Sequence, residues 1–141
     1  TLASCGLGRA LRRGDRIASQ NLEARPQQSP RTLSEGPIRI ILGPDPGGEA
    51  LLGATLRIST TSDRTGTRLE AELAASSKGT IASTPTVVGA IQLPQNGAPI
   101  VIGPDGPVTG GYPIIAVIAR ADRDRFHALP LGASVSFALF S

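Results

Sequence analysis

Aromatic and sulfur-containing side chains are scarce in this chain. Its 141 residues include no Trp and no Met, one Tyr, three Phe and a single cysteine, Cys5. A single cysteine excludes a disulfide bond within the chain. No apolar run reaches the roughly 18 residues that could cross a membrane as a helix. These absences predict a soluble, cytoplasmic protein that neither spans nor binds a membrane.

Lysine and histidine are almost missing as well. The net charge of +3 rests on 13 Arg and only Lys78, and the arginines that cluster (Arg9, Arg12, Arg13 and Arg16) have no aromatic residues among them. Without aromatic side chains to stack on bases, the cluster does not favour nucleic-acid binding. The only histidine, His127, has no Cys or second His at ligand spacing. We expect it at the surface, with neither a metal site nor a catalytic triad.

The abundant residues are those of short strands and turns. There are 17 Gly and 12 Pro, interspersed with runs of Ile, Val and Thr. Branched apolar side chains suit pleated sheets, so the composition predicts an all-β domain, a small barrel or a sandwich. We expect one domain over residues 1–141, as a fragment of a longer chain. Residues 20–36 have no apolar periodicity and predict a flexible loop or linker.

Apolar patterns place the expected strands and one helix. Strands are expected at residues 38–42, 56–58, 69–73, 86–93 and 99–102. Asn96-Gly97 lies between the last two and is typical of a hairpin turn. The only expected helix is residues 122–129, with Asp122 as its N-cap.

The densest group of turn residues is 104–113, which feeds the apolar run 114–119. Asp105 could accept a hydrogen bond from an amide or lactam N–H, and Tyr112 could donate one to its carbonyl. Gly110 and Gly111 would let a backbone or ligand approach closely. The alternative is purely structural: a turn carboxylate, a bend and a packed ring.

Two further polar residues are candidates for binding. Gln92 stands among apolar residues, so its amide either bonds the barrel backbone or points into a pocket. Arg64 could bind a carboxylate through its guanidinium fork. The competing interpretation pairs Arg64 and Arg68 with Asp63 or Glu70 in a solvated hairpin.

Several motifs, in order, resemble one family. Ser62-Asp63-Arg64-Thr65-Gly66-Thr67-Arg68-Leu69-Glu70 resembles its Ser-Asp-Arg-Met-Gly-x-Arg-Leu-Glu signature, and the segments 88–100 and 109–116 resemble its Gly-Ala-Ile-Gln and Thr-Gly-Gly-Tyr-Pro motifs. The chain is similar, from Leu2 to Phe140, to the C-terminal half of the C subunit of 5-oxoprolinase (allophanate hydrolase subunit 2) and of the biotin-dependent carboxyltransferase region of urea carboxylase. The resemblance implies a cyclophilin-like β-barrel.

The resemblance also implies an activity. It implies a part of a complex that opens the lactam 5-oxoproline to glutamate in an ATP-dependent reaction, together with partners that resemble the A and B subunits of 5-oxoprolinase. No nucleotide motif is present, so this chain is expected to bind no cofactor itself, ATP being used by the complex. The alternatives are a urea or amide carboxyltransferase, which would need biotin, and a non-catalytic regulatory module that binds a partner.

The family motif assigns site residues and also departs from them. The family sequence Asp-x-Gln-Thr-Thr-Gly-Gly-Tyr-Pro places its aspartate on Asp105 and its second threonine on Thr109. Pro107 and Val108 stand in place of the glutamine and the first threonine, and Ala133 replaces an aspartate in the last turn. A proline has no amide donor, which favours the non-catalytic alternative. The catalytic residues remain unassigned.

Overall fold

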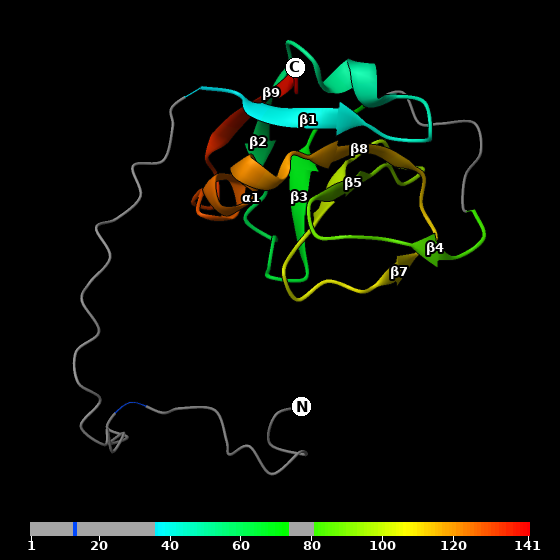
Figure 1. Ribbon diagram of the computed structural model, residues 1–141. Coiled ribbons are helices and arrows are strands. Elements are labelled where there is room, and N and C mark those ends of the chain that lie inside the picture. The colour runs from blue at the N-terminus through cyan, green and yellow to red at the C-terminus, as the bar shows by residue number, and fades with distance from the viewer. Residues whose placement is uncertain (1–12, 14–35, 74–80) are drawn as a thin grey trace, which may run out of the picture. The chain divides into compact units, whose positions relative to one another are not determined.

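The computed structural model describes Arg13 and residues 36–73 and 81–141. Residues 36–73 and 81–141 form a β-barrel with a helix beside it (Figure 1). Its elements are β1 (Ile38–Leu42), the 3-10 helix η1 (Gly48–Leu51), β2 (Thr55–Ile58), β3 (Gly66–Glu70), β4 (Thr84–Pro85), β5 (Ala90–Gln92), β6 (Ile100–Ile102), β7 (Thr109–Gly110), β8 (Ile114–Ile118), α1 (Arg120–His127) and β9 (Ser134–Leu139). The predicted all-β, cyclophilin-like barrel with one short helix is confirmed.

Some expectations fall outside this region. The predicted linker at residues 20–36 lies outside the described residues except for Gly36, and so do Cys5 and most of the arginine cluster. None of the helices in the described ranges is long and apolar enough to cross a membrane.

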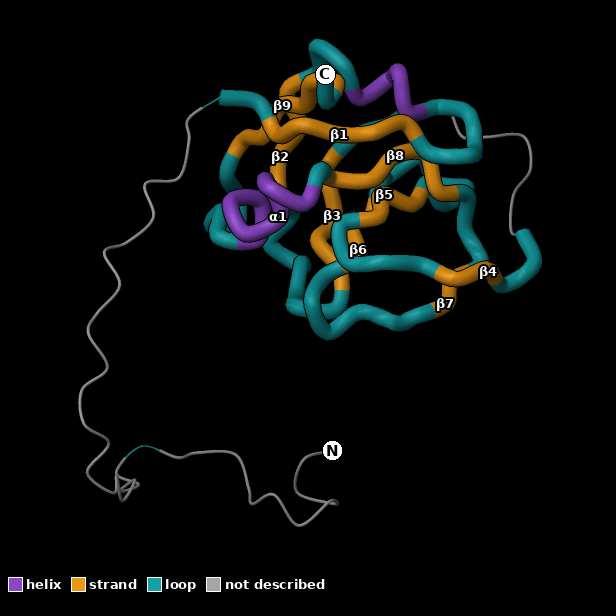
Figure 2. The backbone as a smooth tube through the Cα atoms, viewed as in Figure 1, coloured by secondary structure: helices purple, strands orange, loops and turns teal. Residues whose placement is uncertain are grey.

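Seven strands close the barrel in the order β1-β8-β5-β6-β3-β2-β9. The first and last of them meet in a parallel pair, in which Ile38 is opposite Phe137. The other neighbouring pairs in the barrel are antiparallel. Figure 2 shows the strands wrapping around one interior. Closure satisfies the backbone hydrogen-bonding groups that an open sheet would leave at its edges.

Branched aliphatic side chains fill this interior. Alternate residues of β1 and β2 are buried, with Ile40 and Ile58 at most 2% exposed, as the period of two in a strand requires. The aromatic contribution comes from Phe126 and Phe137, whose ring centroids are 6.4 Å apart. The rest of the core is Ile38, Leu51, Leu56, Leu69, Ile91, Leu93, Val101, Ile115, Ala116, Ile118 and Val135. Aliphatic packing therefore replaces the aromatic residues that the chain lacks.

The predicted Asn-Gly hairpin is confirmed between β5 and β6. Gly97 has φ of +74°, and the Oδ1 atom of Asn96 accepts a hydrogen bond from the N–H of Ala98 at 3.2 Å. Glycine adopts this left-handed conformation without steric cost. The turn sets the register in which Gln92 lies opposite Ile100.

A second, two-stranded sheet lies beside the barrel. In it β4 and β7 are antiparallel, with Thr84 opposite Gly110 and Pro85 opposite Thr109. The Thr-Gly-Gly-Tyr-Pro segment thus begins in this small sheet and leads into β8 of the barrel (Figure 1).

The helix begins earlier than the sequence predicted. Its N-cap position is Ala119, which makes no side-chain capping bond, so the prediction of Asp122 as N-cap was wrong. The carboxylate of Asp122 instead accepts hydrogen bonds from the backbone N and the Nε of Arg39 at 2.8 and 2.9 Å, and from its Nη2 at 2.9 Å. The aspartate therefore joins α1 to β1 rather than capping its own helix.

Asp122 is the most deeply buried charged residue that the structure describes, with 1% of its surface exposed. Arg125, one turn along α1, adds a second ion pair at 3.2 Å. The hydrogen bonds from Arg39 hold the pKa of this carboxyl well below its usual range, against the opposing effect of burial. A buried charge with several partners is stable only while those partners remain in place.

We expect Asp122→Asn to lower the free energy of unfolding by about 3 kcal/mol, because it leaves the Arg125 guanidinium buried without its counter-ion. Urea denaturation at neutral pH measures this loss. The control is Asp124→Asn on the same helix, which removes an exposed carboxylate and should cost less than about 0.5 kcal/mol. Equal losses in the two variants would contradict the role given to Asp122.

The same carboxylate predicts a pH dependence. Its pKa in the folded protein is lowered, so the ionised form is stabilised by folding and its contribution is complete above the unfolded pKa of about 4. The contribution is lost as the pH falls below that value. The stability difference between the wild type and Asp122→Asn should therefore shrink between pH 5 and pH 2 in parallel denaturation series. A difference that stays constant over this range would contradict the prediction.

Candidate functional site

Two of the family motifs dock onto each other as turns. The turn before β3 (residues 62–66) packs against the turn after β6 (residues 103–106). The N–H of Gly103 donates to the carbonyl of Thr65 at 3.0 Å, and the N–H of Asp105 donates to the carbonyl of Arg64 at 3.1 Å. A Cβ atom on Gly103 would overlap that Arg64 carbonyl, so the close approach requires glycine.

The docked turns bring Arg64 and Asp105 together. The Nε and Nη2 atoms of Arg64 donate to the two carboxylate oxygens of Asp105 at 2.6 and 3.0 Å. These bonds lower the pKa of Asp105. Both side chains are more than half exposed, so the pair is geometrically specific but screened by solvent. A lactam N–H would have to share Asp105 with Arg64.

The alternative that pairs Arg64 with Asp63 or Glu70 was wrong, because Arg64 pairs with Asp105. The Oδ1 atom of Asp63 accepts hydrogen bonds from the backbone N–H groups of Thr65 and Gly66, at 2.8 and 3.0 Å. These two bonds lower its pKa. Asp63 thus stabilises its own turn, which leaves Arg64 for the other turn.

Gln92 and Gly110 form a second group. Gln92 lies at a register irregularity between β5 and β8, and only 4% of it is exposed. Its Nε2 atom is buried and has no hydrogen-bond partner among the described residues. A Cβ atom on Gly110 would overlap this Nε2. Two predicted site residues, 18 positions apart in sequence, are therefore in close contact.

The remaining predicted residues continue from this contact. Thr109 is exposed in β7 and Tyr112 is 38% exposed. The carbonyl of Gly111 accepts a hydrogen bond from the N–H of Ile81 at 2.9 Å. The carbonyl of Pro113 accepts a hydrogen bond from the N–H of Leu93 at 3.0 Å. The segment therefore runs alongside the end of β5, next to Gln92.

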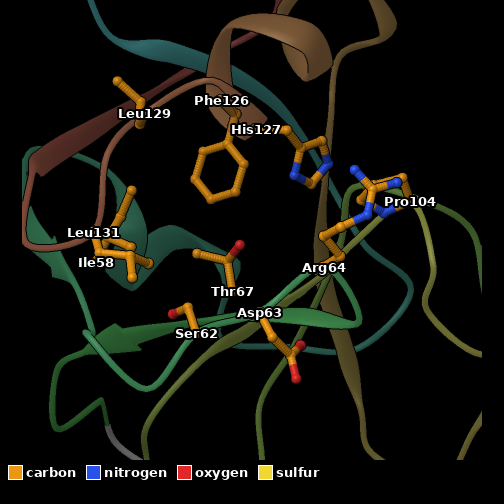
Figure 3. Close-up of a pocket in the computed structure, with 10 residues that line it drawn as sticks. All are labelled: Ile58, Ser62, Asp63, Arg64, Thr67, Pro104, Phe126, His127, Leu129 and Leu131. Carbon is orange, nitrogen blue, oxygen red and sulfur yellow. The ribbon is translucent and has the colours of Figure 1, made fainter. Parts of the chain in front are cut away.

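A pocket of about 240 Å³ lies between α1 and the turn before β3. Figure 3 shows its lining: Ile58, Ser62, Asp63, Arg64, Thr67, Pro104, Phe126, His127, Leu129 and Leu131. Of the residues predicted for the site, Arg64 alone lines it. Gln92 and the segment 109–112 do not.

His127 is the member of this pocket that sequence reasoning assigned to the surface. The structure shows it half-buried, and its Nε2 atom is buried without a partner among the described residues. Burial lowers its pKa. Its ring meets Phe126 edge to face, with centroids 5.3 Å apart. The described ranges contain no cluster of three or more His, Cys, Asp and Glu side chains that could hold a metal.

The contact between Gln92 and Gly110 can be tested by stability. Gly110→Ala forces the buried amide aside and should cost about 1 kcal/mol, the lower end for overpacking because glutamine is flexible. Gln92→Ala removes the obstacle, so the double variant should be more stable than the two single losses predict together. Urea denaturation of the four proteins measures this coupling. If the loss of stability in the double variant equals the sum of the two single losses, the contact between Gln92 and Gly110 is contradicted.

Comparisons with known proteins identify the family of this chain. The family model described as "Carboxyltransferase domain, subdomain A and B" matches residues 1–139. The chain is 33% identical over 140 residues to the 5-oxoprolinase C subunit of Escherichia coli K12, covering 92% of this chain and 45% of that protein. It is 38% identical over 53 residues to the 5-oxoprolinase C subunit of Haemophilus influenzae. This match covers 38% of this chain and 17% of that protein. The chain thus spans less than half the length of these relatives.

Solved structures show the same barrel. TTHA0988 superposes with a TM-score of 0.66 at 28% identity, covering 92% of this chain and 25% of that one. The Kluyveromyces lactis urea amidolyase superposes with a TM-score of 0.64 at 24% identity, covering 74% of this chain and 7% of that one, a likeness of fold alone. Because the family model matches nearly the whole chain, the protein belongs to the family of carboxyltransferase domains, subdomains A and B.

Proposed function

We propose that this chain is the lactam-binding part of a protein that corresponds to the C subunit of 5-oxoprolinase. In this proposal it acts with partners resembling the A and B subunits of that enzyme in the ATP-dependent hydrolysis of 5-oxoproline to glutamate. Family membership and the 33% identity to the Escherichia coli protein support the proposal. ATP is used by the complex and not by this chain.

The observation that carries the proposal is the unpaired amide of Gln92. Its Nε2 is a buried donor without an acceptor among the described residues, and leaving such a donor unpaired costs free energy. The carbonyl of a lactam is an acceptor of the matching kind. A site built around a buried polar group binds the ligand that satisfies it and rejects an analogue that does not.

Neighbouring residues complete the proposed site. Tyr112 is exposed beside the Gln92 strand and could donate its hydroxyl to the same carbonyl, while Thr109, Gly110 and Gly111 supply a backbone with little side-chain bulk. Asp105 and Arg64 form the ion pair at the other end of the loop. In this arrangement they hold the loop that carries the Thr-Gly-Gly-Tyr-Pro segment.

One feature favours a non-catalytic binding module as a second candidate. Val108, in place of the family threonine, is 79% exposed, and Pro107, in place of the glutamine, offers no amide. An exposed apolar residue beside a lost donor suits contact with a partner protein better than contact with a lactam. A carboxyltransferase acting on urea or another amide would also require a biotinyl carrier.

The activity is tested on the full-length protein combined with its A-type and B-type partners. The assay follows 5-oxoproline-dependent ATP hydrolysis and glutamate release. We expect turnover in the wild type, and a KM for 5-oxoproline raised about tenfold in Gln92→Met, because the variant lacks the donor that pairs with the lactam carbonyl.

The matched control is Gln95→Met, since Gln95 is exposed in the adjacent turn; it should leave KM unchanged. Equal KM values in the wild type and both variants would remove Gln92 from the site. Binding to the B-type partner without any lactam turnover would overturn the hydrolase proposal and select the binding module.

A further inference from the structure

The pocket beside α1 has the form of a small-molecule site separate from Gln92. Ile58 and Phe126 form an apolar floor that is at most 2% exposed, and Leu129 and Leu131 extend it to one side (Figure 3). Its volume of about 240 Å³ is below the roughly 300–1,000 Å³ typical of drug-sized ligands. An apolar pocket of this size with a few convergent polar groups suits a small metabolite.

Some of the polar residues around the pocket already have partners. The hydroxyl of Ser62 accepts from the N–H of Arg68 at 2.9 Å and donates to the Arg68 carbonyl at 3.3 Å. Asp63 holds its own turn through two backbone N–H groups, and Figure 3 shows its carboxylate directed away from Phe126 and His127. The Ser62 hydroxyl and the Oδ1 atom of Asp63 are therefore engaged by the chain itself.

Three other groups retain hydrogen-bonding capacity within the described part of the chain. The Nε2 atom of His127 is buried and unpaired. Arg64 gives two N–H groups to Asp105, which leaves three of the five that a guanidinium carries. The hydroxyl of Thr67 points toward the Phe126 ring (Figure 3). Arg64 can only donate, and Thr67 and His127 can donate as well, so a single group that binds all three is an acceptor.

Charged side chains of both signs lie close to His127. Arg64 and Arg123 both disfavour its protonation, and only Asp124 favours it. Asp105 faces Arg64, and Asp63 is turned away as described above. An anion beside His127 would therefore face two cations, Arg64 and Arg123, and one carboxylate, Asp124.

We propose that this pocket binds a small carboxylate with an apolar body. The carboxylate accepts hydrogen bonds from Arg64 and from Nε2 of His127, with Thr67 as a third donor. The apolar body lies on Phe126, Ile58 and Leu129. The proposal is independent of the lactam function, because neither Gln92 nor the segment 109–112 lines this pocket.

The single histidine of the chain makes a direct test possible, since its imidazole gives one set of NMR signals in untagged protein. Two probe compounds distinguish carboxylate binding from lactam binding. Cyclopentanecarboxylate has a carboxylate and an apolar ring, whereas 2-pyrrolidinone has a lactam and no carboxylate. We expect cyclopentanecarboxylate to shift the His127 signals saturably and to raise the midpoint of their pH titration, because a nearby anion favours the imidazolium. 2-Pyrrolidinone should leave both unchanged.

Variants distinguish ligand binding from loss of the ion pair. Arg64→Gln should weaken cyclopentanecarboxylate binding about tenfold, as expected for a lost charge-assisted hydrogen bond, whereas Arg120→Gln, an exposed arginine on α1, should not weaken it. Asp105→Asn breaks the same ion pair but leaves the guanidinium free, so it should preserve or increase the affinity. Thr67→Val should weaken binding less than Arg64→Gln.

Three results would overturn the proposal. They are the absence of a saturable shift with cyclopentanecarboxylate, an equal response to 2-pyrrolidinone, and an equal loss of affinity in Arg64→Gln and Asp105→Asn. None of them bears on 5-oxoproline turnover in the assembled complex, so a failure here is distinguishable from a failure of the proposed hydrolase function.

Discussion

A single buried carboxylate holds the helix to the barrel. Asp122 is bound by Arg39 of β1 through both backbone and side chain, and Arg125 reaches from the same cluster to the carbonyls of Gly36 and Pro37 at 2.5 and 2.6 Å. The segment that enters β1, the strand itself and α1 therefore share one set of charges. Because β1 also closes the barrel against β9, the helix is attached to the strand that completes the closure. The helix in turn supplies Phe126 and His127 to the pocket.

Patterns of neighbouring residues predicted some elements of the fold correctly but did not predict the role of Asp122. The apolar run 38–42 and the Asn96-Gly97 turn were correctly predicted, since strand alternation and left-handed glycine are properties of adjacent residues. Asp122 was misassigned because an aspartate at a helix start serves equally well as a cap or as a buried ion-pair partner. The deciding residue, Arg39, lies 83 positions away, beyond the reach of any local pattern.

The candidate site residues could be predicted from the sequence, but their pairing could not. The motifs singled out Gln92, Gly110, Arg64 and Asp105, but only the folded chain sorts them into two pairs. Arg64 pairs 41 residues away, because its neighbour Asp63 is occupied by the backbone of its own turn. The pocket beside α1 has no sequence signature: His127 follows Phe126 in a short polar helix, and its partial burial arises from packing against elements distant in sequence.

The small sheet of β4 and β7 shows how this protein limits unwanted pairing. A closed barrel presents no strand edge to another chain, so the two-stranded sheet beside it is where a foreign strand could add. β4 ends at Pro85, which has no N–H to offer to a new ladder. A proline in an edge strand is one of the devices by which natural sheets resist aggregation. Pro85 thereby limits the addition of a foreign strand at the outer edge of β4, the partner of the strand that bears Thr109 and Gly110.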